Sequence, residues 1–287
     1  MIAIYQKELK SYFNNLFGYL YIAIILLFMG VFATYVHFKN MVADFGYSLD
    51  SLAIVVLLVT PLLTMRIIAE ERQKKTDQLL YSLPISISST VVAKYLAMLT
   101  VYFVPMAVIG IYPLVLSAFG TINFVRAYGC ILAFFLMGAC LLAIGMFISA
   151  LTENQIISAI LSFVVMLLIY FATSLASLVP STAVSSFIAI TVMVVVLGIV
   201  VYIMVKNYLL ALGVTALVEV GLSALYMVKP TLFEGLFADI IRWISVYSRC
   251  SSFYNGIFDL TSIVYFLSVV FLFVFLTIQA VEKRRWS

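Results

Sequence analysis

The sequence predicts an all-α protein, a polytopic membrane helix bundle with about eight transmembrane helices. Of its 287 residues, 66% are hydrophobic and only 10% are charged, and the mean hydropathy is +1.22, whereas soluble domains are about half apolar. A helix needs roughly 20 mostly apolar residues to cross the bilayer. Runs of that length fall at residues 17–37, 49–68, 93–119, 127–151, 156–179, 184–205, 208–228 and 262–281. So little polar sequence leaves no room for a soluble catalytic domain, and we expect a single transmembrane domain over residues 1–287.

The distribution of Lys and Arg predicts that both termini are cytoplasmic. Short cytoplasmic loops are enriched in these residues. With the N-terminus inside, eleven of the 16 cations fall in or near the cytoplasm and five fall outside, namely Lys39, Arg126, Lys229, Arg242 and Arg249. The even number of spans agrees with this orientation in the cell membrane.

Residues 1–16 predict an interfacial helix ahead of the first span. Apolar side chains recur at helical spacing on one side, and polar ones occupy the other, which suits a helix in the headgroup plane. The apolar positions are Ile2, Tyr5, Leu9, Tyr12, Phe13 and Leu16. A frayed cytoplasmic tail is the alternative. No signal-peptide cleavage site follows the first apolar run, so we expect this span to stay in the mature protein.

An extracytoplasmic amphipathic region is predicted at residues 229–261. Between Thr231 and Trp243 the chain is too short and too charged to span the bilayer, yet one face is apolar. One or two short helices dipping into the outer leaflet fit this pattern. Asp259 to Ser262 supply good N-cap residues for the last helix.

The charged loop at residues 69–92 is the most distinctive segment. Glu70 and Lys74, and likewise Glu71 and Lys75, are spaced i,i+4, which favours a solvated helix. An apolar patch of Leu79, Leu80 and Leu83 follows, and Pro84 ends the helix. Ser86 or Ser88 is then available to cap the next helix. The segment is interpreted as a rigid helix beneath the membrane. A merely solvated connector between spans is the alternative.

The order of residues in this loop resembles the cytoplasmic loop of type-two permeases of ATP-binding-cassette (ABC) exporters. That family has a Glu-Glu-Arg run, Gly-Thr, paired leucines, a Leu-Pro-hydrophobic-Ser turn and Gly-Lys-Tyr. The matching residues here are Glu70, Glu71, Arg72, Thr76, Leu79, Leu80, Leu83, Pro84, Ser86, Lys94 and Tyr95. Lys75 and Ala93 depart from the family's Gly. Because Lys and Ala are better helix formers than Gly, we expect the helix to be intact or strengthened there.

Both ends of the chain are similar to the gliding-motility-associated subfamily of these permeases. Its pattern is matched by Phe17-Gly-Tyr-Leu20, by Phe253 to Ser262 and by Gln279 to Trp286. The centre, from the fifth to the seventh span, is generic apolar sequence. Many such permeases have six spans, so an extra pair near residues 156–205 would be a departure.

The resemblance implies a permease subunit that couples ATP hydrolysis on a separate chain to substrate export. It predicts an ABC ATPase dimer as partner, a second permease copy or a related permease, and an extracytoplasmic auxiliary protein, but no nucleic acid. No Gly-x-x-x-x-Gly-Lys-Ser/Thr phosphate loop occurs in this chain. We therefore expect no cofactor here and ATP with magnesium on the ATPase. The predicted ATPase-coupling residues are Glu70, Glu71, Arg72, Thr76, Leu79, Leu80, Leu83 and Pro84.

Glu219 is the one acidic residue well inside a predicted span, where an isolated carboxylate is costly. It is interpreted either as a polar site for substrate or gating or as a packing contact between helices. A gradient-driven transporter using Glu219 and a non-transporting scaffold are the rival functions. An embedded enzyme is disfavoured by the lack of a catalytic motif. His37 has no companion histidine, so a metal site has little support.

Overall fold

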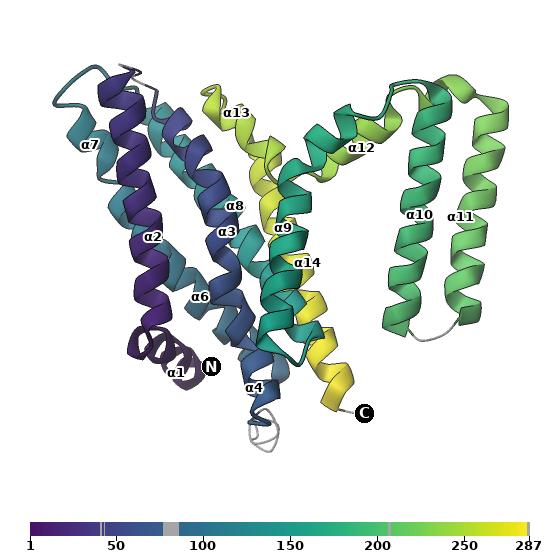
Figure 1. Cartoon of the computed structure of the whole chain (residues 1–287), viewed down its shortest axis with the longest axis horizontal. Helices are drawn as coiled ribbons and strands as arrows, with labels where there is room; N and C mark the ends of the chain where they lie inside the picture. The colour runs from purple at the N-terminus through teal and green to yellow at the C-terminus, as the bar shows by residue number, and fades with distance from the viewer. Residues whose placement is uncertain (41, 43, 77–85, 206–207, 286–287) are drawn as a thin grey trace. The chain divides into compact units, whose positions relative to one another are not determined.

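The protein is mostly helical in the part of the chain that the computed structural model describes, which is residues 1–40, 42, 44–76, 86–205 and 208–285. No strand occurs in those residues, so the predicted all-α fold class is confirmed (Figure 1). The long helices are α1 (Ile2–Asn14), α2 (Leu16–Ala33), α3 (Gly46–Ile67), α6 (Ile87–Ile109), α8 (Phe124–Leu151), α9 (Gln155–Ser177), α10 (Ala183–Val205), α11 (Tyr208–Val228) and α14 (Leu260–Arg285). The short ones are η1 (Thr34–Lys39, a π-helix), α4 (Ala69–Gln73), α7 (Tyr112–Leu116), η2 (Pro230–Phe233), α12 (Leu236–Ile244), η3 (Ser248–Cys250) and α13 (Ser251–Tyr254).

Helices occupy all eight predicted spans. Among the described residues, six are long and apolar enough to cross a membrane: Leu16–Lys39, Gly46–Gln73, Ile87–Leu116, Phe124–Leu151, Gln155–Ser177 and Leu260–Arg284. The predicted sixth and seventh spans are occupied by α10 and α11, which contain the further apolar stretches Ala183–Val196 and Leu212–Val228. The chain is therefore a multi-pass membrane protein.

The chain divides into two compact units. Unit 1 comprises Met1–Ile169 and Arg249–Ser287, and unit 2 comprises Tyr170–Ser248. Helix α8 forms the centre of unit 1, where α3, α6 and α14 pack against it. Two glycines permit this approach, because a Cβ at Gly138 would lie 2.3 Å from the Tyr102 ring and one at Gly145 would lie 2.5 Å from Thr64 Oγ1. Small residues bring membrane helices close in this way.

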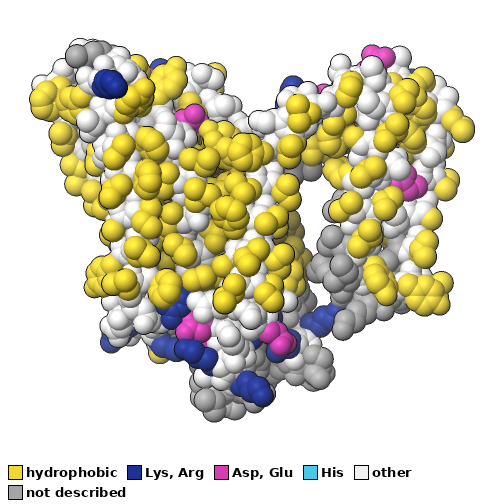
Figure 2. Space-filling view, viewed as in Figure 1, with side chains coloured by type: hydrophobic (Ala, Val, Ile, Leu, Met, Phe, Trp, Pro, Cys, Tyr) yellow, Lys and Arg dark blue, Asp and Glu magenta, His cyan; other side chains and the backbone are white. Residues whose placement is uncertain are grey.

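Helix α1 packs against α6 and α2 at one end of this bundle (Figure 1). Its buried side chains are Ile4, Glu8 and Tyr12, whereas Ile2 is exposed. The predicted apolar stripe is therefore only partly the packing face, because Glu8 turns inward. On the view of unit 1 in Figure 2, hydrophobic side chains cover the bundle and charged ones gather at the end that carries α1 and α4.

Helix α6 begins at Ile87, ahead of the apolar run at residues 93–119 and directly after a predicted cap, Ser86. The Ser86 hydroxyl accepts a hydrogen bond from the amide of Ser89 at 3.3 Å, which confirms one of the two predicted caps. The helix ends at Ile109, and a separate turn of helix, α7, follows. Pro113 lies at the start of α7, a position that proline suits, within the candidate span Ile87–Leu116.

Within unit 2, α10 and α11 form an antiparallel hairpin. A Cβ at Gly198 would lie 2.3 Å from Thr215 Oγ1, and the rings of Phe187 and Tyr226 stack at 4.5 Å. The predicted amphipathic region, residues 229–261, contains the short helices η2, α12, η3 and α13. Gly235, at φ 72°, separates η2 from α12. Only glycine adopts this left-handed conformation without strain, so it marks the break between the two short helices.

Candidate coupling site

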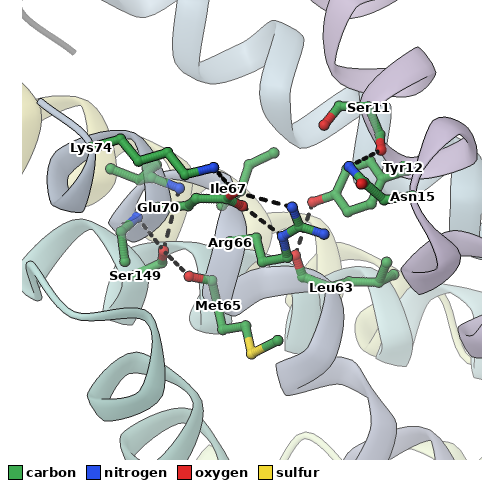
Figure 3. A network of polar contacts seen from close by, with 12 residues as sticks. Ser11, Tyr12, Asn15, Leu63, Met65, Arg66, Ile67, Glu70, Lys74 and Ser149 are labelled. Atoms are coloured by element: carbon green, nitrogen blue, oxygen red, sulfur yellow. Dashed lines mark hydrogen bonds and ion pairs between the residues drawn. The ribbon is translucent and has the colours of Figure 1, made fainter. Parts of the chain in front are cut away.

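The charged loop begins at a break between α3 and α4. A buried side chain supplies hydrogen bonds to the backbone amides at this break. At Ile68 the backbone leaves the helical conformation, with φ −125°. The Ser149 hydroxyl, on α8, accepts hydrogen bonds from the amides of Ile68 at 3.4 Å and Ala69 at 3.1 Å, and it donates to the carbonyl of Met65 (Figure 3). Orphan amides at a helix start need such partners. One α8 hydroxyl thus fixes the point at which α4 begins.

Arg72 is buried and points back into the bundle. Its guanidinium donates to the carbonyl of Ala150, in the last turn of α8. The final carbonyls of a helix lack partners within the helix and carry partial negative charge. Arg72 therefore holds α4 against the end of α8.

Lys94 is the centre of a buried charge cluster that joins three helices to the end of α3. Its ammonium lies 2.9 Å from Glu8 Oε1 on α1, 2.9 Å from Glu71 Oε1 on α4 and 3.0 Å from the carbonyl of Ile67. These three acceptors match the three donors of an ammonium. Lys7 lies 3.0 Å from Glu71 and 3.4 Å from Glu8. Two cations and two carboxylates thus balance one another.

Two side chains of α1 beside this cluster, Lys7 and Tyr12, have raised pKa values. Burial of the Lys7 ammonium lowers its pKa, but Glu71 and Glu8 favour its charged form, and the net result is a raised pKa. Burial raises the pKa of the Tyr12 phenol well above its ordinary value, and Glu8 adds to the effect. The Tyr12 hydroxyl donates to the carbonyl of Leu63 at 2.8 Å. A neutral hydroxyl therefore fastens α1 to α3 beside the ion pairs.

A second, more exposed set of charges lines the α3–α4 junction (Figure 3). Arg66 donates to Glu70 at 2.6 and 3.1 Å, and Lys74 donates to the same carboxylate at 2.7 Å. The Arg66 guanidinium also lies over the Phe17 ring of α2, 4.3 Å from its centroid. A cavity of about 270 Å³ opens between α1 and this junction, lined by Lys7, Glu8, Ser11, Tyr12, Arg66, Ile67, Glu70, Glu71, Lys74 and Thr76.

The predicted coupling residues fall in two groups. Glu70, Glu71, Arg72 and Thr76 are described. They lie in residues 69–76, which we call the root of the loop. The carboxylates of Glu70 and Glu71 and the guanidinium of Arg72 contact other residues of this chain. Leu79, Leu80, Leu83 and Pro84 lie outside the described residues. The predicted Glu70–Lys74 pair is present at 2.7 Å. The partners of Glu71 are Lys7 and Lys94, one from α1 and one from α6.

The expectation that Lys75 continues or strengthens the helix is wrong. Helix α4 ends at Gln73, and Lys75 adopts φ 56°, in the left-handed region. Glycine enters this region without steric cost, while other residues pay roughly 1 kcal/mol. The turn that follows is closed by the amide of Thr76, which donates to the carbonyl of Glu71 at 2.9 Å. The position demands a turn former, and helix propensity was the wrong criterion.

Sequence reasoning missed Glu8, Lys94 and Ser149 as parts of this site. Glu8 was given no role, and Lys94 was named only as a family match. One signal was available: Lys94 lies at the start of a long apolar run, where a lone cation needs an anionic partner. Nothing in the sequence indicated that the partners are Glu8 and Glu71.

Glu219 lies on α11, in unit 2. Its Oε1 atom is buried and has no hydrogen-bond partner among the described residues.

The fold and this site define a multi-pass helical membrane protein whose charged loop is built into the bundle by ion pairs. The chain belongs to the ABC-2 family of transporter proteins, whose model matches residues 37–228. The matched part contains α3, α4, Lys94 and Ser149, while α1 precedes it. No curated protein matches the chain. Membership makes it an ABC-2 type permease, the generally non-catalytic transmembrane component of an ABC transporter, and implies an ATP-binding partner subunit.

Proposed function

We propose that this chain couples ATP hydrolysis on a separate ATPase subunit to substrate export, and that the root of the charged loop transmits the movement. The observation that carries the proposal is the position of Lys94, whose ammonium contacts α1, the end of α3 and α4 at once. Buried ion pairs resist separation because breaking one leaves an uncompensated charge. A force on the loop is therefore passed to several helices together.

The loop divides into a docking part and a transmitting part. The residues beyond Thr76, with Leu79, Leu80, Leu83 and Pro84, are proposed to dock on the ATPase, as the family resemblance implies. Glu70, Glu71 and Arg72 have their charged groups directed at the bundle. We assign them to transmission, in place of the direct ATPase contact expected from the sequence. Apolar anchors in an interface contribute about 2 kcal/mol or more each, which suits the leucines for docking.

The assembly that follows has two ATPases and two permeases. ATP and magnesium are held by the ATPase subunits, and the second permease is an identical copy or a related chain. An extracytoplasmic auxiliary protein is a further proposed partner. The two termini lie on the cytoplasmic side of the cell membrane in this proposal, an orientation that the excess of Lys and Arg there favours. In the same orientation the loop lies on the cytoplasmic side, where ATP is available.

Gentle affinity purification of the chain from its native membrane tests this proposal. Mass spectrometry of the bound proteins and an ATP hydrolysis assay are the readouts. We expect an ABC ATPase to co-purify with the chain in stoichiometric amount. A preparation free of ATPase that still transports would refute it.

Leu79→Asp sharpens the test, because a charge in an apolar anchor opposes docking. We expect it to remove the ATPase while the helices stay inserted. Leu178→Asp is the matched control, since Leu178 is an exposed leucine at the end of α9 on the predicted outer side. Equal ATPase recovery with Leu79→Asp and with the wild type would contradict the docking role of this segment.

A gradient-driven transporter is the second candidate, and one observation favours it. The buried Glu219 Oε1 atom lacks a hydrogen-bond partner in the described part of the chain, and carboxylates inside membranes often mark ion pathways. Glu219→Gln separates the two functions. Under the ATPase-driven proposal transport remains ATP-dependent in this variant, whereas a gradient-driven carrier loses its coupling to the ion.

A further inference from the structure

The charges at the root of the loop are sorted by sign between the interior and the surface. The side chains of Glu8, Glu71 and Glu70 are only 10%, 17% and 19% exposed, whereas those of Lys7 and Lys74 are 60% and 65% exposed. Lys10 and Lys75 are also exposed. Every exposed charged side chain of α1 and of residues 69–76 is therefore a lysine.

This sorting follows from the contacts inside the site. The carboxylates face inward because they neutralise the buried Lys94 ammonium and the Arg66 guanidinium. Of the exposed lysines, Lys7 pairs with Glu8 and Glu71 and Lys74 pairs with Glu70, whereas Lys10 and Lys75 form no ion pair within the described residues. Lys7 and Lys74 border the same cavity, so they belong to one patch. We name Lys7, Lys10, Lys74 and Lys75 the lysine rim.

We propose that the lysine rim binds an acidic surface on the ATPase partner, next to the groove that receives the loop. This inference rests on the proposed function. Its first support is continuity, because Lys74 and Lys75 directly precede the segment assigned to docking. Its second is charge complementarity, because a surface whose exposed charges are all positive favours a partner of opposite sign. The acidic surface steers the ATPase to the loop, and the leucines then hold it.

Anionic lipid headgroups are the competing occupant of a basic patch beside a membrane. The ATPase is favoured because two of the four lysines follow α4 and directly precede, in sequence, the segment assigned to docking. A patch serving lipid alone would be confined to α1, the helix predicted to lie in the headgroup plane.

The experiment measures the association rate of the purified permease with its co-purified ATPase at several salt concentrations. The test variant is Lys10→Glu/Lys75→Glu, because neither lysine forms an ion pair within the described residues and the buried cluster stays intact. The control, Lys39→Glu/Lys229→Glu, makes the same charge change at exposed lysines on the predicted outer side. We expect about a tenfold slower association for the test variant at low salt, a difference that shrinks as salt screens the charges. The control should match the wild type.

Unchanged association of the test variant at every salt concentration would overturn the inference. If that variant also binds phosphatidylglycerol vesicles more weakly than the wild type, the rim is assigned to lipid. This result requires an ATPase that binds the wild type, so it leaves the proposed function standing. Absence of any ATPase from the wild-type preparation would instead remove the proposed function itself.

Discussion

The ammonium of Lys94 lies 2.9 Å from the carboxylate of Glu8, although 86 residues separate the two in sequence. The pair joins the helix that precedes the first span to the helix that follows the charged loop. Lys94 also holds Glu71 and the last carbonyl of α3. The loop therefore starts from a fixed point, which is the basis of the transmission proposed here.

Removing Lys94 is expected to destabilise the protein strongly. Lys94→Met leaves Glu8 and Glu71 without their shared partner, and breaking a buried ion pair from one side costs about 3–5 kcal/mol. Thermal unfolding of the purified protein in detergent measures the effect. Lys10→Met, at an exposed lysine of the same end, is the control and should change stability little. The triple variant Lys94→Met/Glu8→Gln/Glu71→Gln should recover part of the loss, and no recovery would argue against charge pairing as the cause.

Lys75 is expected to respond to substitution as a turn residue. At φ 56° glycine avoids the steric cost that a Cβ carries, of about 1 kcal/mol. Lys75→Gly should therefore be at least as stable as the wild type, and Lys75→Ala should not exceed Lys75→Gly. Thermal unfolding of the Lys75→Gly and Lys75→Ala variants, measured side by side, compares their stabilities. Higher stability of the alanine variant would indicate that the helix continues through this position.

Gly145 is expected to tolerate no larger residue while Thr64 is present. A Cβ at Gly145 would lie 2.5 Å from Thr64 Oγ1 and 2.8 Å from its Cβ, so Gly145→Ala forces α3 and α8 apart, which costs about 1–3 kcal/mol. Thr64→Gly should relieve part of this cost. A double-mutant cycle on thermal stability measures the coupling. Additive effects of the two substitutions would contradict the close contact. Gly120→Ala, where nothing lies within 4 Å, is the neutral control.

Helix α12 is expected to lie in the outer membrane interface. Asp239 and Arg242 are exposed on its polar side, and Trp243 is largely exposed; tryptophan is enriched at this depth. The chain has two tryptophans, so Trp286→Phe leaves Trp243 as a single probe. We expect brominated lipids to quench its fluorescence, most strongly with bromine near the headgroup. Quenching by aqueous iodide alone would place α12 in water. Trp243→Phe, which retains Trp286, is the control.

The sequence was sufficient for the fold class because apolar length and composition determine which segments can cross a bilayer. The break at Ile68 falls at the predicted end of the second span, whereas α6 starts at Ile87, several residues before the predicted third span. Such ends depend on capping contacts, and the contact from Ser149 to Ala69 is distant in sequence. Periodicity alone gives no signal for it.

The candidate site was predictable only in part. Local spacing indicated the pair of Glu70 and Lys74, which lies within one short segment. The partners of Glu71 come from α1 and α6, and only the packing of those helices brings them together. Lys94 matched the family's sequence pattern, but the pattern did not indicate what this residue does. Its burial explains the role, because a cation that leaves water needs anionic neighbours.

The central claim is that the root of the loop transmits between ATPase and spans, and ATP hydrolysis tests it most directly. Three samples are compared: the ATPase alone, its complex with the wild-type chain, and its complex with Glu8→Gln/Glu71→Gln. This variant weakens the ion pairs but leaves the residues beyond Thr76 unchanged. The account predicts that the wild-type chain changes the hydrolysis rate and that the variant still binds the ATPase but returns the rate to that of the ATPase alone. An unaltered rate in the variant complex, equal to that of the wild-type complex, would contradict it.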